Sequence, residues 1–234
     1  MKSTVDEIRE RFDNDVERFS NLQTGQSSTI DAPLVLDLIT EAVEAVNPNA
    51  GHILDVGCGA GNYTLKILEK FPQADATLVD LSQPMLEKAK ERTENATTGN
   101  IKIIQSDIRA LKLEEKTFDV ITAAAVLHHL RSDEQWEQVF SKLFRSLKPG
   151  GSLWISDLIK HSHADIQHIM WNRYGEYLTG LRGKAYRDKV FRYIKKEDSP
   201  KPLMYQLDLL KSVGFETVEI LHKNNCFAAF GGIR

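Results

Sequence analysis

Cysteine, long apolar runs and net charge are the features of which this sequence has little. Its two cysteines, Cys58 and Cys226, cannot form a disulfide framework, and neither lies in a Cys-x-x-Cys pair typical of zinc or redox sites. No apolar run approaches the roughly 20 residues that cross a bilayer, so we expect a soluble, cytoplasmic protein. The net charge of −3 provides no general attraction to nucleic acid or to an anionic membrane.

The 234 residues, 41% of them hydrophobic, suffice for one domain with a small cap and exclude a disordered chain. Short apolar runs that predict strands alternate with amphipathic segments that predict helices, two of them capped by Ser82 and Ser132. The predicted strands are 52–56, 76–79, 101–105, 118–123 and 152–156, and the predicted helices are 62–70, 83–95, 133–147 and 203–213. Because parallel neighbours need long crossovers, this alternation indicates a parallel sheet.

The two ends of the chain complete the prediction. Apolar positions from Val5 to Phe19 recur at helical spacing, a polar loop follows at 23–29, and Asp31 is expected to cap the next helix. Near the C-terminus two short strands, 217–222 and 225–231, are joined by a tight turn, so the last strand must run antiparallel. We expect one domain over 1–234, in which 1–31 is a helical lid and 158–202 a helical insert on the substrate side.

Three glycines follow the first predicted strand. Gly57, Gly59 and Gly61 lie where a buried strand ends and a helix begins, so a ligand can approach the backbone closely there. A tight turn without a ligand is the alternative interpretation. The pattern is GxGxG rather than the GxGxxG of dinucleotide sites, and Asp55 precedes it. A carboxylate at that point would repel a pyrophosphate and attract a cation, which favours a positively charged cofactor.

Acidic residues end the next two predicted strands. Asp80 is placed to accept both hydroxyls of a ribose, and Asp107 to accept the exocyclic amine of adenine, although either could instead cap a helix. Ligands of doubly wound sheets bind at the carboxyl ends of parallel strands. Three strand ends that each carry a suitable polar group therefore indicate a nucleoside site.

An ordered set of segments resembles the motifs of class I S-adenosylmethionine-dependent methyltransferases. The segments are 55–61 (DVGCGAG), 79–82 (VDLS), 106–108 (SDI), 118–121 (FDVI) and 147–151 (LKPGG), and the resemblance covers about 51–231. It implies a Rossmann-like, doubly wound α/β fold of seven strands, mostly parallel with an antiparallel last strand, and S-adenosyl-L-methionine as cofactor. The cofactor contacts that it implies are Gly57 and Gly59 for the methionine part, Asp80 for the ribose, Leu81, Asp107 and Ile108 for the adenine, and Ala124 near the reacting end.

Two adjacent histidines follow the fourth predicted strand. His128 or His129 could act as a general base when an acceptor is methylated, because a neutral imidazole can take a proton from a hydroxyl or an amine. A structural role for both rings is the alternative, and methyl transfer can also proceed by positioning alone. His161 and His163 could approach this pair in space, but without an i, i+4 pair or a flanking Cys we expect no metal site.

The insert is basic and aromatic. Between 173 and 196 eight basic residues stand against two acids, a local charge of +6. Trp171, Tyr174 and Arg187 are candidate acceptor-binding residues, and the alternative for the aromatics is that they pack a lid. A small acid or RNA would suit the positive charge, and the acidic remainder of the chain favours the small acid. We therefore expect transfer of a methyl group to a small anionic or aromatic molecule, with no membrane partner.

The layout is also similar to the carboxy-S-adenosylmethionine synthases of the tRNA wobble-uridine pathway. Those enzymes grip a modified cofactor with an arginine from the insert, a place that Arg187 could occupy. The chain departs from that family at Gly59 and Ala124, where serine and asparagine are expected. Carboxymethyl chemistry, a tRNA-modifying methyltransferase, and a module that senses the cofactor without turnover are the alternative functions.

Overall fold

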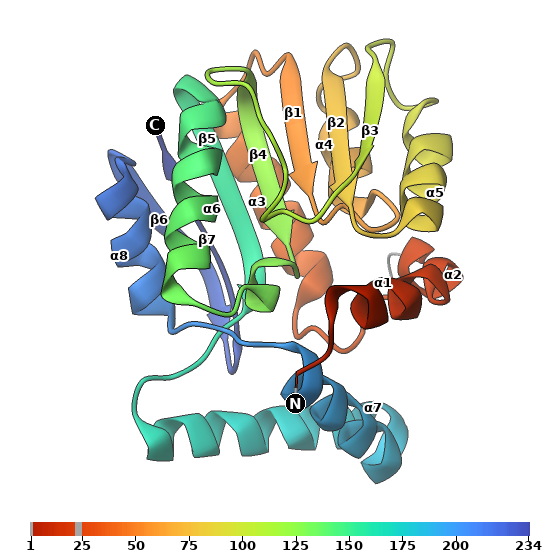
Figure 1. The fold of residues 1–234 in the computed structure, drawn as a ribbon, viewed down its shortest axis with the longest axis vertical. Coiled ribbons are helices and arrows are strands. Elements are labelled where there is room, and N and C mark those ends of the chain that lie inside the picture. Colours follow the sequence, from red (N-terminus) through yellow and green to blue (C-terminus); the bar gives the residue numbers. More distant parts are fainter. Residues whose placement is uncertain (1, 22–24) are drawn as a thin grey trace.

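The protein is built on a central seven-stranded sheet, seen in a computed structural model that describes residues 2–21 and 25–234 (Figure 1). Two residues of the predicted loop, Gln23 and Thr24, lie outside those ranges. The strands are β1 (His52–Val56), β2 (Asp75–Asp80), β3 (Ile101–Gln105), β4 (Phe118–Ala124), β5 (Leu147–Leu158), β6 (Thr217–Asn224) and β7 (Phe227–Ile233). The order is β3-β2-β1-β4-β5-β7-β6, with β7 antiparallel to both of its neighbours and the remaining pairs parallel. The predicted α/β fold is confirmed.

Helices cover both faces of this sheet. On one face α6 (Asp133–Ser146) and α8 (Leu203–Val213) share an apolar core with the central strands. On the other face lie α3 (Ala32–Val46), α4 (Asn62–Leu68) and α5 (Gln83–Thr93), with a second core beneath them. In Figure 1 the two sets of helices sandwich the strands. Both cores lie against the sheet, so the strand ends are held in fixed positions.

The structure confirms two of the three predicted helix caps. Ser82 and Ser132 cap α5 and α6 as predicted, because each hydroxyl accepts the backbone N–H three residues further on. The prediction that Asp31 caps α3 is wrong. Its backbone is left-handed (φ 59°) and its side chain makes no hydrogen bond to that helix. The carboxylate is hydrogen-bonded instead to His222 and Asn224 on β6, at 2.9 and 2.8 Å.

The N-terminal segment forms two helices rather than the single predicted helix. α1 (Val5–Asp13) and α2 (Val16–Ser20) are separated by Asn14 and Asp15. The Asn14 amide donates back to the carbonyl of Glu10 at 2.7 Å, which offers the backbone an alternative to continued helix. The apolar spacing was correctly interpreted, but it contains no information about this break.

The insert forms one long element, α7 (Ala164–Glu197), which is bent in the middle. Arg182 and Gly183 leave helical geometry, and Gly183 has φ 81° and ψ 174°. The two limbs pack together through aromatic side chains, with Trp171 stacked on Phe191 at 4.4 Å between ring centroids. Figure 1 shows α1, α2 and α7 lying across the carboxyl ends of the parallel strands. None of the helices in the described ranges is both long and apolar enough to cross a membrane.

Candidate active site

A cavity lies between the carboxyl ends of the strands and the helices that cover them. We call its two sides the sheet half and the lid half. The sheet half contains Asp55, Gly57, Gly59, Asp80, Leu81, Asp107, Ile108 and Ala124. The lid half contains Val5, Ile8, Phe12, Arg18, Phe19, Tyr174, Tyr193, Ile194, Asp198 and Phe227. His128 and His129 lie on the wall where the halves meet.

The glycine loop between β1 and α4 faces the cavity at Gly59. A Cβ built there would meet no atom within 4 Å, and the backbone has φ 50°, so a side chain would be strained and would fill open space. Gly61 differs, because a Cβ there would lie 3.1 Å from Ala89 on α5, and Gly61 does not line the cavity. Its predicted contact with the cofactor is not supported, and its small size serves the packing of α4 on α5.

Asp55 lies at the base of the sheet half and is fully enclosed. Its two carboxylate oxygens accept hydroxyl hydrogens from Thr64 at 2.6 Å and Thr122 at 2.9 Å. Burial raises the pKa of Asp55, partly offset by these hydrogen bonds. Asp55 therefore ties the strand β1 to α4 and β4 beneath the glycine loop.

Asp80 ends β2 and is fixed by the backbone. One carboxylate oxygen accepts the N–H of Gly59 and the other accepts the N–H of Ser82, both at 2.9 Å. Burial raises the pKa of Asp80 to about 6. Each oxygen keeps a second lone pair, so the carboxylate can still accept hydrogen bonds from a ligand's hydroxyls.

Asp107 follows β3 and is held by Arg109, a residue that the sequence analysis missed. The guanidinium Nε donates to Asp107 at 2.9 Å, a second guanidinium nitrogen donates to the other oxygen, and the Arg109 N–H adds a bond of 2.8 Å. Burial alone would raise the pKa of Asp107, but the hydrogen bonds from Arg109 outweigh it and the pKa lies below its usual value. Leu81 and Ile108 flank this pair on the cavity wall.

His128 lies in the short 3-10 turn η1 (Leu127–His129) after β4 and is held by Asp157 at the end of β5. One Asp157 oxygen accepts the N–H groups of Leu127 and His128 at 2.9 and 3.2 Å, and the other is hydrogen-bonded to Nδ1 of the His128 ring. Burial would lower the pKa of His128, but the charges of Asp157 and Asp198 outweigh it and raise the pKa to about 9. The raised pKa disfavours the neutral ring that a base needs, and the predicted role of His128 as a base stays a prediction.

His129 is the uncharged partner of this pair. Burial, followed by the charges of His128 and Arg11, holds the pKa of His129 well below its usual value. Neither ring nitrogen has a hydrogen-bond partner, and Nδ1 lies 3.6 Å from a carboxylate oxygen of Asp198. His129 therefore keeps a free lone pair at the cavity wall, and its predicted role as a base stays a prediction.

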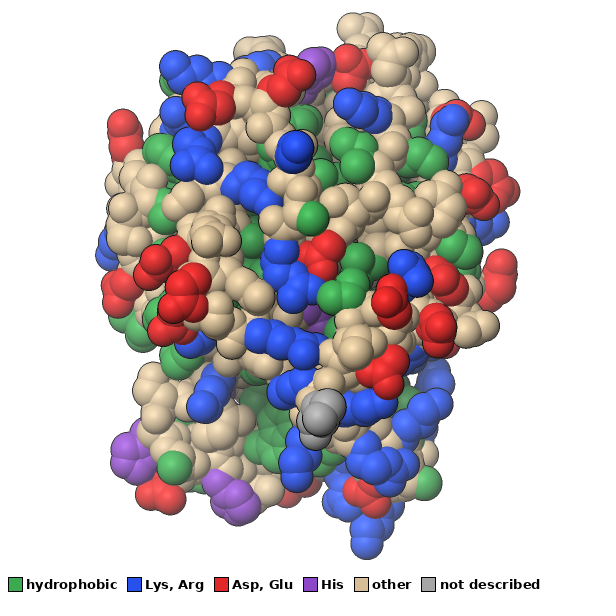
Figure 2. All heavy atoms as spheres, in the orientation of Figure 1, with side chains coloured by type: hydrophobic (Ala, Val, Ile, Leu, Met, Phe, Trp, Pro, Cys, Tyr) green, Lys and Arg blue, Asp and Glu red, His purple; other side chains and the backbone are tan. Residues whose placement is uncertain are grey.

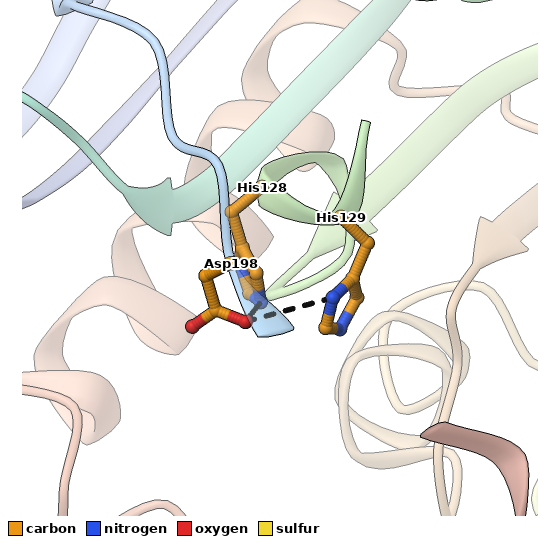
Figure 3. A group of neighbouring side chains, drawn as sticks. All are labelled: His128, His129 and Asp198. Atoms are coloured by element: carbon orange, nitrogen blue, oxygen red, sulfur yellow. Dashed lines mark ion pairs between the residues drawn. The ribbon is translucent and has the colours of Figure 1, made fainter. Parts of the chain in front are cut away.

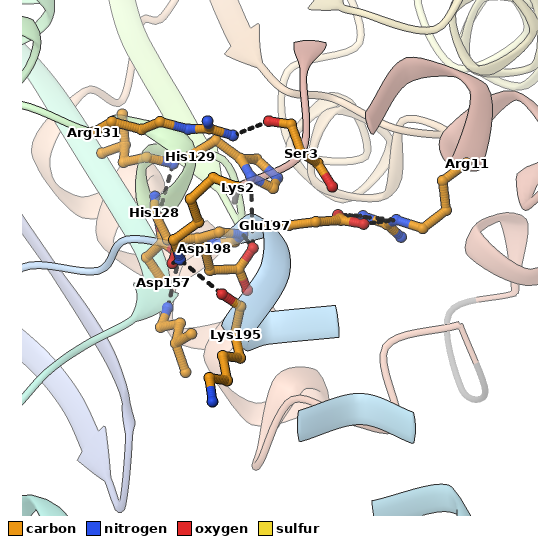
Figure 4. A network of polar contacts seen from close by, with 12 residues as sticks. Lys2, Ser3, Arg11, His128, His129, Arg131, Asp157, Lys195, Glu197 and Asp198 are labelled. Atoms are coloured by element: carbon orange, nitrogen blue, oxygen red, sulfur yellow. Dashed lines mark hydrogen bonds and ion pairs between the residues drawn. The ribbon is translucent and has the colours of Figure 1, made fainter. Parts of the chain in front are cut away.

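Polar contacts of Arg11, Ser3 and Lys2 join the N-terminal segment to the end of α7 (Figure 4). We call this set of contacts the latch of the lid. Arg11 grips both carboxylate oxygens of Glu197, with nitrogen to oxygen distances of 2.7 to 3.0 Å. The N–H of Ser3 donates to the carbonyl of Lys196 at 3.1 Å, and the Lys2 ammonium donates to the carbonyl of Lys195 at 3.0 Å. These contacts join the N-terminal segment to the end of α7, so the two parts of the lid are held together.

Of the three predicted acceptor-binding residues, Tyr174 alone lines the cavity. It is 1% exposed, and its hydroxyl donates to the carbonyl of Ser28 at 2.9 Å. Trp171 packs between the limbs of α7, and Arg187 pairs with Asp188 at 2.7 Å. Arg187 is therefore not placed to bind a carboxylated cofactor.

Figure 2 shows Lys and Arg side chains running down the middle of one face, over the junction of the lid with the sheet domain.

Comparison with known proteins agrees with this geometry. A family described as "Methyltransferase domain" matches residues 53–151. The demethylmenaquinone methyltransferase of Lactococcus lactis is 30% identical over 172 residues, which cover 71% of this chain and 66% of that protein. The enzyme of the same name from Listeria welshimeri is 26% identical over 188 residues, 78% of each chain.

Solved structures share the fold at low identity. The phospholethanolamine N-methyltransferase 2 of Haemonchus contortus, in complex with S-adenosylhomocysteine, superposes with a TM-score of 0.63 at 19% identity, covering 93% of this chain and 46% of that one. The [4+2]-cyclase SpnF gives a TM-score of 0.64 at 18% identity, covering 96% and 78%. Because a cyclase also has this fold, the fold alone does not fix a reaction.

These findings define the class of protein as a methyltransferase. The chain belongs to the class I S-adenosylmethionine-dependent methyltransferases, and S-adenosylmethionine is its cofactor. The sheet half fits that molecule, because the position of Gly59 opens onto unfilled space and Asp80 keeps acceptor capacity beside it. A buried carboxylate, Asp55, suits the positive charge of a sulfonium.

Proposed function

We propose that this chain methylates a small aromatic molecule held in the lid half of the cavity. The observation that carries the proposal is the lining of the lid half, to which five aromatic rings contribute: Phe12, Phe19, Tyr174, Tyr193 and Phe227. Such rings bury an aromatic ligand through offset stacks and edge contacts. Further support comes from the relatives, whose named acceptor, demethylmenaquinone, carries a quinone ring.

The sheet half provides the cofactor contacts in this proposal. We expect Gly57 and Gly59 to contact the methionine part, Asp80 to accept the ribose hydroxyls, and Leu81 and Ile108 to flank the adenine. S-adenosylmethionine supplies an electrophilic methyl group on a sulfonium sulfur. The residues of this chain orient both molecules and exclude water from the space between them, which favours transfer through proximity.

The acceptor needs no strong negative charge. Arg187 lies outside the cavity, and most of the basic residues of α7 are exposed, so the positive charge of the insert does not line the acceptor space. Among the lid residues that line the cavity, Arg18 on α2 carries a positively charged side chain. This placement favours the aromatic acceptor over the small acid that the charge pattern suggested.

The test is a methyl-transfer assay with labelled S-adenosylmethionine and a panel of ring-hydroxylated acceptors, compared with aliphatic acids. Transfer to ring compounds is expected, and Phe12→Leu should raise the KM for the acceptor by roughly 2- to 12-fold, the scale of one aromatic contact. Phe144→Leu, on α6 outside the cavity, is the matched control and should leave that KM unchanged. Turnover of aliphatic acids but not of ring compounds would overturn the proposal.

A further inference from the structure

Three side chains from distant parts of the sequence converge at the boundary between the halves (Figure 3). His128 and His129 come from η1, and Asp198 follows directly after α7. One oxygen of Asp198, Oδ1, lies 3.6 Å from Nε2 of His128 and 3.6 Å from Nδ1 of His129. Among residues 2–21 and 25–234 this is the one group of three His, Cys, Asp or Glu residues whose ligand atoms lie within 4.8 Å of one another.

The cluster is buried, and several of its polar atoms lack partners. Asp198 is 4% exposed and its Oδ1 has no hydrogen-bond partner. The same is true of both ring nitrogens of His129. Buried polar groups are nearly always hydrogen-bonded, so two unpaired atoms that lie 3.6 Å apart, Asp198 Oδ1 and His129 Nδ1, indicate a missing ligand.

The orientation of His128 suits the same ligand. Asp157 engages Nδ1 of the ring, so Nε2 is directed toward Asp198. A histidine that binds a metal through one nitrogen commonly donates from the other to a carboxylate, which fixes the tautomer and the direction of the ring. His128 has this partner although its neighbour His129 does not.

Buried carboxylates lie at and beside the cluster. Asp157 and Asp198 are both buried carboxylates. None of the nearby cations fills the position at Oδ1 of Asp198, because Arg11 donates to Glu197, Arg131 to the carbonyl of Ser3, and Lys2 to main-chain carbonyls. A bound metal ion would place positive charge next to the carboxylate of Asp198, at an oxygen that no basic side chain contacts by a hydrogen bond.

We propose that Nε2 of His128, Nδ1 of His129 and Oδ1 of Asp198 bind one divalent first-row transition ion, zinc in the first place. In a tetrahedral zinc site with bonds of 2.0 to 2.1 Å, neighbouring ligand atoms lie about 3.3 Å apart, close to the two separations of 3.6 Å seen here. Three protein ligands leave a fourth position open, as in catalytic zinc sites. All three residues line the cavity, so that position faces the acceptor space.

The role of the ion rests on the proposed function, whereas the ion site itself does not. An acceptor oxygen at the open position would be oriented, and the pKa of its hydroxyl would be lowered by the ion. The lone pair of His129 would then serve as a ligand rather than as a base. Magnesium would suit this site poorly because it prefers oxygen ligands in octahedral geometry.

The test is calorimetric titration of the metal-stripped full chain with zinc sulfate, without S-adenosylmethionine. One ion per chain is expected, together with a visible absorption band when cobalt replaces zinc, and no competition from magnesium. His129→Ala and Asp198→Asn should each weaken zinc binding at least tenfold, the scale reported for disturbed metal sites. His168→Ala, an exposed histidine on α7, is the matched control and should bind zinc as the wild type does.

Circular dichroism and S-adenosylmethionine affinity of the same preparations distinguish loss of the ion from loss of the fold. If His129→Ala does not fold, the more conservative His129→Gln replaces it. Zinc binding of equal affinity in the wild type, His129→Ala and Asp198→Asn would overturn the proposal, as would no heat at millimolar zinc. Either result leaves the methyl-transfer assay unaffected, so failure of the ion site and failure of the proposed function are separable.

Discussion

The sheet half and the lid half of the cavity differ in how their polar groups are held. In the sheet half Asp80 is fixed by backbone N–H groups and Asp107 by Arg109. In the lid half Asp198 Oδ1 has no hydrogen-bond partner, and neither has either ring nitrogen of His129 on the wall that the lid half meets. The polar groups of the sheet half are therefore preorganised, whereas the unpaired atoms of Asp198 and His129 are free to bind a ligand. This contrast separates the part of the site proposed to bind the cofactor from the part proposed to hold the acceptor.

The largest effect is expected at Asp157, where the two halves meet. Asp157→Ala removes the acceptor for the N–H groups of Leu127 and His128 and leaves a buried charged ring without its partner. We expect a loss of about 3–5 kcal/mol in the free energy of unfolding, measured with urea. Asp165→Ala, exposed at the start of α7, is the control. A loss below about 1 kcal/mol would show that Asp157 does not organise this junction.

The sheet half is tested next through Asp80. Asp80→Ala removes hydrogen bonds to the proposed ribose site and should weaken S-adenosylmethionine binding by about 1–3 kcal/mol, measured by calorimetry. Asp75→Ala is a matched control, because Asp75 lies at the other end of β2 and does not line the cavity. Equal affinity in the two variants would contradict the assignment of the ribose to Asp80.

The pH dependence of cofactor binding tests the same carboxyl group. Burial raises the pKa of Asp80 to about 6, so the group becomes protonated as the pH falls through 6 and loses acceptor strength. We expect S-adenosylmethionine affinity to be roughly tenfold lower at pH 5 than at pH 8, since about a tenth of the group is then ionised. Asp80→Asn cannot titrate and should remove this dependence. An unchanged pH profile in Asp80→Asn would mean that another group is responsible.

The smallest effect concerns the latch of the lid. Arg11→Ala breaks the paired hydrogen bonds to Glu197, whose side chain is 7% exposed, and should destabilise α1 and the end of α7 by about 1–2 kcal/mol. Faster amide exchange in 5–20 and 184–197 is the readout. Arg9→Ala is the control, because the pair with Asp6 is exposed and worth less than about 1 kcal/mol. Equal exchange in both variants would show that the latch does not hold the lid.

Sequence reasoning correctly placed the residues whose position depends on neighbours along the chain. Asp80 ends β2, the glycine loop follows β1 and Asp107 lies just after β3, and parallel pairing brings all three strand ends to one edge. The lid could not be derived in the same way. Periodicity placed Trp171 and Tyr174 on one helical face, but the bend at Gly183 decides which side chains meet the cavity.

Asp198 is a second residue whose position in the site could not be derived from the sequence. It lies 69 residues beyond His129 in the sequence, and no motif marks it. It reaches the histidines because α7 folds back on itself and ends beside η1, where the N–H of Ser199 donates to the carbonyl of His128 at 2.6 Å. Such a contact is a product of tertiary packing, and the prediction of no metal site was made without it.

The most direct test of the division between the halves is a crossed kinetic measurement on Asp80→Asn and Phe12→Leu. With labelled S-adenosylmethionine and a ring acceptor that the wild type methylates, the account predicts that Asp80→Asn raises the KM for S-adenosylmethionine and leaves that for the acceptor unchanged. Phe12→Leu should do the reverse. If both variants raise the KM for S-adenosylmethionine and neither raises that for the acceptor, the division of the cavity into two halves is contradicted.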